Sequence, residues 1–137
     1  MLLKENNLMK VFVDTNIFLR FLLADNPRQS PACRRLFEKA KNGKISLITL
    51  PIVMAEIVWV LHSFYKETRK EVARKLKIIL LFEGLEVVHR DALMMAVEIF
   101  EKKNIDFIDA YVAVWSKQQE LKKIYSYDKD YDRIEGV

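Results

Sequence analysis

The sequence predicts an α/β fold in which helices cover both faces of a mainly parallel sheet. Short apolar segments rich in β-branched residues alternate with longer segments of helical pattern. Cap and breaker residues separate these segments, and 51% of the 137 residues are hydrophobic, enough for one core. Strands that alternate with helices favour parallel pairing with both sheet faces buried.

The first third of the chain is predicted as strand, helix, helix. Residues 9–13, MKVFV, are short, apolar and β-rich, and residues 17–23, IFLRFLL, continue as a helix. Asn26-Pro27 ends that helix. Ser30 followed by Pro31 is typical of an N-cap and a first helical position, and Gly43 supplies a left-handed C-cap after Lys41.

The middle third is predicted as strand, helix, helix, strand. Residues 45–50 form the second strand, and Pro51 begins a helix that ends near Tyr65. Thr68 to Glu71 has the spacing of a capping box, so a helix extends from there to about Phe82. Gly84 ends it, and residues 85–88 form the third strand.

The last third is predicted as helix, helix, strand. Asp91 is expected to cap a helix that ends near Asn104, and Asp106 a helix that ends near Leu121. Residues 123–126, KIYS, are expected to form a fourth strand.

The chain is expected to be one domain over residues 9–137, preceded by a flexible tail over residues 1–8. The start is too polar for a secretory signal. Residues 45–64 have the length of a membrane span, but Pro51 and Glu56 interrupt the stretch, so we expect no membrane association. A single cysteine, Cys33, allows no intrachain disulfide, fits a reducing cytoplasm and is expected to pack in a helix.

The net charge is +4, from 23 basic and 19 acidic side chains. If a metal neutralises part of the acids, the remaining surface is more basic still, which suits a polyanionic substrate. Basic residues gather between Lys66 and Lys77 on one predicted helix. A solvated helix face is the simpler interpretation, and a nucleic-acid groove is the alternative.

Four groups of acidic residues lie where predicted strands or helices begin or end. Each is expected at one edge of the sheet, because ligands bind beyond the carboxyl ends of parallel strands. Carboxylates gathered in one pocket repel each other unless a cation neutralises them, and oxygen ligands suit Mg²⁺ or Mn²⁺. The candidate metal ligands are Asp14, Glu56, Asp109 and Asp128, with Asn16, Asp106 and Asp130 as supporting residues.

Each acidic group also has a simpler interpretation. Asp14 and Asp106 are suited to cap helices, and the segment around Asp128 resembles a polar turn. Glu56 lies in a helix that is apolar all round, which predicts a buried carboxylate held by a metal or by an ion pair.

Other active-site chemistries have no support in the sequence. His62 and His89 lack zinc spacing, and His62 is expected to pack on its own helix. The chain contains no P-loop, dinucleotide fingerprint or nucleophile elbow.

The segments VDTNIFLRFLL, DFIDAYVAV and SYDKDYDRI, with Glu56 between the first two, together resemble the PIN-domain family, and within it the VapC-type ribonuclease toxins. The resemblance extends from about Met9 to Ile134, and the four acidic motifs in this order are specific. Tyr131 stands where the family often has phenylalanine.

The resemblance implies a PIN-like three-layer α/β/α sandwich and RNA cleavage with Mg²⁺ or Mn²⁺. It places the acidic quartet on Asp14, Glu56, Asp109 and Asp128. It places the accompanying acids on Asp106 and Asp130, and the polar supporting residues on Asn16 and Ser126. It also implies a cognate antitoxin protein and a homodimer. Apolar side chains beyond the needs of a small sheet agree with an interface; they are Ile17, Phe18, Phe21, Leu22, Trp59 and Phe64. The alternative is a catalytically inactive PIN-like module that binds RNA.

Overall fold

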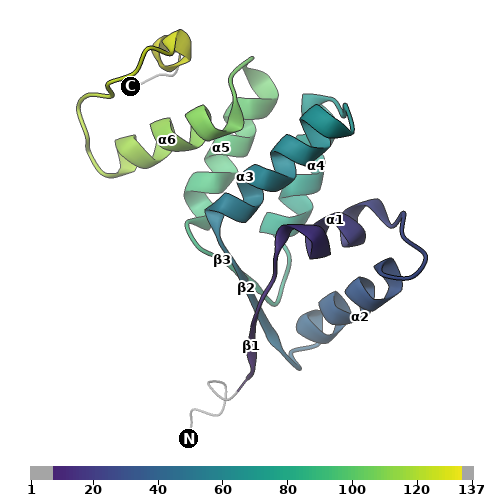
Figure 1. Cartoon of the computed structure of the whole chain (residues 1–137). Helices are drawn as coiled ribbons and strands as arrows, with labels where there is room; N and C mark the ends of the chain where they lie inside the picture. The colour runs from purple at the N-terminus through teal and green to yellow at the C-terminus, as the bar shows by residue number, and fades with distance from the viewer. Residues whose placement is uncertain (1–7, 134–137) are drawn as a thin grey trace, which may run out of the picture.

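Three short parallel strands form the sheet in the computed structural model, which describes residues 8–133 (Figure 1). They are β1 (Lys10–Phe12), β2 (Ser46–Thr49) and β3 (Leu85–Val87), and β2 lies in the centre. Val11 pairs with Leu47, and Leu47 with Leu85, so the apolar side chains of neighbouring strands are in register. The predicted α/β sandwich with a parallel sheet is confirmed.

Helices follow each strand and cover the sheet (Figure 1). The α1–α2 pair lies on one side of the strands and α6 on the other. The helices are α1 (Thr15–Leu23), α2 (Ser30–Lys41), α3 (Pro51–Trp59), α4 (Arg69–Leu80), α5 (Arg90–Lys102) and α6 (Phe107–Gln118). A π-helical turn, η2 (Val60–Phe64), continues α3, and a 3₁₀ turn, η3 (Lys129–Arg133), follows the last helix. Within residues 8–133, every helix is too short or too polar to cross a membrane.

Two predicted helix ends are confirmed and two predicted caps are wrong. Thr68 accepts a hydrogen bond from the Glu71 amide at 3.2 Å, and Gly43 adopts φ +76° after α2. Ser30 does not cap α2; its hydroxyl donates to the Arg20 carbonyl and accepts from the Asn26 amide, which joins α2 to the end of α1. Asp91 lies in the first turn of α5, because the N-cap position is taken by His89.

The predicted fourth strand over residues 123–126 is wrong. This segment is irregular, and the sheet within residues 8–133 has three strands. Three of its four side chains are exposed, including Tyr125 at 92%, so it buries too little apolar surface to offset the entropy of strand formation. Asp128 therefore follows a loop. The predicted tail falls mostly on residues 1–7, which lie outside the described residues, and the 9–137 boundary remains a prediction.

The core explains most of the apolar side chains that suggested an interface. Phe18 is fully buried, and the other residues of α1 in that set pack against the core. Cys33 is buried in α2, as expected. Trp59 and Phe64 differ, because 63% and 68% of their surfaces are exposed.

Helix α3 is not buried all round, so the prediction of a buried Glu56 is wrong. Ile52, Glu56 and Trp59, spaced four and three residues apart, form one exposed stripe. The opposite face, with Met54 and Ile57, packs in the core. An apolar helix sequence cannot show which face meets solvent, because the periodic signal is missing.

Three basic side chains of α4 form ion pairs, and one of these pairs joins α4 to another helix. Arg74 pairs with Glu71 at 3.0 Å on an exposed part of α4, which agrees with a solvated helix face. Lys75 pairs with Glu67 at 2.5 Å in a mostly buried position, and Lys77 pairs with Glu98 of α5 at 2.5 Å.

Arg69 ties α4 to the turn between α5 and α6. Its Nη1 donates to the carbonyls of Phe100 at 2.9 Å and Ile105 at 2.8 Å, and its guanidinium lies 4.4 Å from the centre of the Phe100 ring. We expect Arg69→Met to lower the free energy of unfolding by about 2 kcal/mol, because buried carbonyls lose a charged donor. Urea unfolding measures this. Lys70→Met, at an exposed neighbouring position, is the control, and equal midpoints for the two variants would contradict the prediction.

Candidate metal centre

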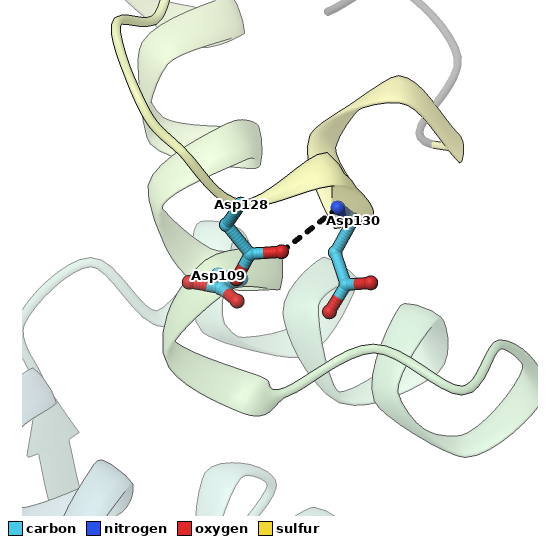
Figure 2. A group of neighbouring side chains, drawn as sticks. All are labelled: Asp109, Asp128 and Asp130. Carbon is cyan, nitrogen blue, oxygen red and sulfur yellow. Dashed lines mark hydrogen bonds between the residues drawn. The ribbon is translucent and has the colours of Figure 1, made fainter.

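Three aspartates meet at the start of α6 (Figure 2). Asp109 lies in the first turn of α6, Asp128 in the loop that returns along this helix, and Asp130 in η3. Each offers a carboxylate oxygen, and these oxygens all lie within 4.8 Å of one another. The helix N-terminus favours negative charge at Asp109. Asp109 thus forms one oxygen-rich group with two aspartates that follow it by 19 and 21 positions along the chain.

Hydrogen bonds order the loop that carries Asp128. The Ser126 hydroxyl accepts from the Asp128 amide at 2.9 Å, and Asp128 Oδ1 accepts from the Asp130 amide at 2.9 Å (Figure 2). The Tyr131 hydroxyl donates to Asp109 Oδ1 at 3.3 Å. Tyrosine at this position therefore links η3 to α6, which a phenylalanine could not do.

The electrostatics of this group favour a bound cation. Burial, as the larger cause, and the neighbouring Asp128 together raise the pKa of the Asp109 carboxyl to about 6, against the lowering effect of the Tyr131 hydrogen bond. Burial and the Asp109 charge also raise the pKa of the Tyr131 hydroxyl. Deprotonated carboxylates this close repel each other, and a divalent cation bound between them would relieve the repulsion. Oxygen donors of this kind fit Mg²⁺ or Mn²⁺.

Asp14 and Glu56 form a second acidic group. Asp14 follows β1 at the N-cap of α1, where its Oδ1 accepts from the Thr15 amide at 2.7 Å. The buried Thr15 hydroxyl donates to Glu56 Oε1, which ties the first turn of α1 to α3. Asp14 lies at the carboxyl edge of the sheet, as the sequence predicts. Glu56 is held by its hydrogen bond from the Thr15 hydroxyl.

The structure brings some of the predicted site residues together and leaves others apart. Asp109, Asp128 and Asp130 share one group, with Ser126 beside it, whereas Asp14 and Glu56 lie outside it. Asp106 occupies the N-cap of α6 without a side-chain capping bond, and it lines one cavity with Asp109 and Asp128. Asn16 is exposed and lines a different cavity, between α1 and α2.

Two residues with contacts to the candidate acids were not predicted from the sequence. Thr15 bonds Glu56 and Tyr131 bonds Asp109. Thr15 directly follows the candidate ligand Asp14 in the sequence, but only the structure shows that its hydroxyl is buried and therefore needs a partner. The contact of Tyr131 depends on how η3 folds back onto α6. Among the histidines, His62 packs edge-on against Phe100 of α5, whereas the sequence predicts packing on its own helix.

Comparison with known proteins relates the sequence of this chain to one protein family. The PIN domain family model matches residues 11–137. The VapC ribonuclease of Aquifex aeolicus (strain VF5) is 22% identical over 122 residues, which cover 89% of this chain and 90% of that protein. No solved structure gives a significant match.

Proposed function

Because the chain belongs to the PIN-domain family, we propose that it is a metal-dependent endoribonuclease and the toxin of a toxin–antitoxin pair. The observation that carries the proposal is the group of three carboxylates at the start of α6, in a chain similar to a VapC ribonuclease. The proposed substrate is RNA, and the products are a 5′-phosphate and a 3′-hydroxyl.

The proposed catalytic and metal-binding quartet is Asp14, Glu56, Asp109 and Asp128. Asp109 and Asp128, with Asp130, would hold Mg²⁺ or Mn²⁺ through carboxylate oxygens. When bound, the metal lowers the pKa of a water molecule and offsets the charge on the leaving oxygen. Ser126 and Tyr131 keep the two aspartates in place through the bonds described above. No side-chain nucleophile is required, and the cysteine is buried in α2.

Asp14 and Glu56 would act on the same bound RNA from the other acidic group. The Thr15 bond fixes the direction of Glu56, and the cap bond fixes that of Asp14. The proposal therefore requires both acidic groups for cleavage, which the variants below test separately.

The alternative function is a catalytically inactive PIN-like module that binds RNA. The grouped carboxylates argue against this alternative, because without a bound metal they would repel the RNA phosphates. A module that only binds RNA gives no reason for these acids to be grouped. Tight RNA binding without cleavage under every divalent metal would favour this alternative.

A metal titration with RNA tests the proposal. The wild-type protein should cleave with Mg²⁺ or Mn²⁺ and not with EDTA, and Asp14→Asn should lower the rate about 10³-fold, the effect of several kcal/mol on the barrier. Asp132→Asn changes the same charge at an exposed position outside the cluster and should cleave normally. Sequencing of the cut ends identifies the products. Cleavage in EDTA, or equal rates for wild type and Asp14→Asn, would refute the proposal.

The partners extend the same proposal. A cognate antitoxin would mask the site by placing an arginine or lysine among the carboxylates, where a cation replaces the charge of the metal. A homodimer is proposed from the family, and the exposed side chain of Phe64 supports an interface. We place the protein in the cytoplasm, in agreement with a free cysteine and the absence of any disulfide partner for it.

A further inference from the structure

A cavity of about 490 Å³ lies between α3, η2 and α6. The carboxylates of Asp106, Asp109 and Asp128 line it, so it is continuous with the proposed metal centre. Trp59, His62 and Ser63 line it as well. The acidic group accounts for some of these side chains but not for the aromatic and neutral polar ones.

Trp59 is the most unusual side chain of this cavity. It exposes 63% of its surface, although it belongs to a helix whose other large side chains are mostly in the core. An exposed indole leaves a flat aromatic surface in water beside a group of carboxylates. Such a surface is favourable when a second flat, uncharged ring stacks on it.

The π-helical turn after Trp59 brings neutral polar groups to the same cavity. The Tyr65 amide bonds the Val60 carbonyl five positions back, at 3.0 Å, which widens the turn that carries His62 and Ser63. His62 Nδ1 lies 2.9 Å from the Glu67 carbonyl, and a carbonyl can only accept, so Nδ1 carries the hydrogen. In the neutral ring, Nε2 is then the acceptor, and Ser63 adds an exposed hydroxyl.

We propose that this cavity binds one unpaired base of the RNA substrate, stacked on Trp59, next to the phosphate that is cleaved. This inference rests on the proposed function and names a part of its substrate site. With a cation at the carboxylates, the phosphate that is cleaved would lie there, and the neighbouring part of the cavity, lined by Trp59, His62 and Ser63, is aromatic and neutral, which suits an uncharged base. The volume is that of a small-ligand pocket, and single-stranded RNA presents bases for stacking on aromatic rings while a duplex does not.

The test uses the fluorescence of Trp59. The chain has two tryptophans, so Trp115→Phe leaves Trp59 as the reporter. In Ca²⁺, single-stranded RNA hexamers should quench this fluorescence. A hexamer without bases, and a duplex of the same sequence, should quench it much less.

Affinity provides a second measurement. Trp59→Ala should weaken hexamer binding about tenfold, in the range for loss of one stacked base, and Trp59→Phe should restore most of it. Trp115→Ala is the matched control, because this partly exposed tryptophan of α6 does not line the cavity, and its affinity should equal that of wild type. Light scattering of each variant shows whether the oligomeric state has changed.

The outcomes separate this inference from the proposed function. Cleavage by the wild type together with equal affinity for Trp59→Ala, or binding without quenching, would overturn the base site and leave the nuclease intact. A Trp59→Ala variant that binds RNA normally but loses self-association would assign Trp59 to contact with a second copy, which also overturns it. A wild type that neither binds nor cleaves RNA with any divalent metal would refute the proposed function and this inference with it.

Discussion

Asp109→Asn should abolish RNA cleavage and, in the same protein, raise the melting temperature measured without divalent metal at pH 7. Cleavage should fall at least about 10³-fold, because a proposed metal ligand is lost. The unfolding free energy should rise by about 1 kcal/mol, allowing for solvent screening, because a carboxylate that burial and Asp128 destabilise becomes neutral. A substitution that abolished cleavage by unfolding the protein would lower the melting temperature instead, so the two explanations give opposite signs.

The pH dependence gives the sign of this effect. The pKa of Asp109 in the folded protein is about 6, above the ordinary value of 3.8, so the folded state holds this proton more tightly than the unfolded state. The contribution of Asp109 to stability is therefore full below about pH 4 and is lost as the pH rises to about 6. The melting temperature of Asp109→Asn should therefore exceed that of the wild type by an amount that grows between about pH 4 and about pH 6 and is constant at higher pH.

Saturating Mg²⁺ or Mn²⁺ should close or reverse the difference, because the metal stabilises the wild type by binding its folded state. Asp91→Asn is the matched control, since Asp91 is also a first-turn acid, on α5, and is exposed. It should show neither the pH-dependent gap nor the loss of cleavage. A lower melting temperature for Asp109→Asn at pH 7 without metal would contradict the prediction.

Glu56→Gln should also abolish cleavage, but with no change in stability beyond about 0.5 kcal/mol. The sequence predicts a buried Glu56, whose replacement would stabilise the protein. The structure shows an exposed side chain held by Thr15, and a glutamine oxygen can accept the same hydrogen bond. Cleavage assays with Mg²⁺ and thermal unfolding followed by circular dichroism measure the two effects.

Glu38→Gln, at an exposed position of α2, controls for the change of charge. The comparison of Glu56→Gln with Asp109→Asn decides whether the two acidic groups belong to one active site. If Glu56→Gln cleaves like the wild type, the site consists of the aspartates at the start of α6, and the Thr15–Glu56 bond serves to join α1 to α3.

The sequence by itself determined the features that depend on neighbouring residues. Apolar periodicity and cap residues predicted the three strands and the succession of helices, because such signals act within a few positions. Gly43 and Thr68 are examples, since a left-handed C-cap and a capping hydroxyl need only their local chain. Asp14 and Asp109 could be recognised because they stand between β1 and α1 and in the first turn of α6.

Tertiary structure decided which faces are buried and which acids meet. Residues 123–126 have the local character of a strand, but pairing requires a sheet edge and buried side chains that this segment does not have. Glu56 lies in an apolar helix whose exposed face follows from where the helix packs. Asp109, Asp128 and Asp130 come together because the loop and η3 fold back onto α6, as the Tyr131 bond to Asp109 shows. Such contacts join positions far apart along the chain, and no local pattern encodes them.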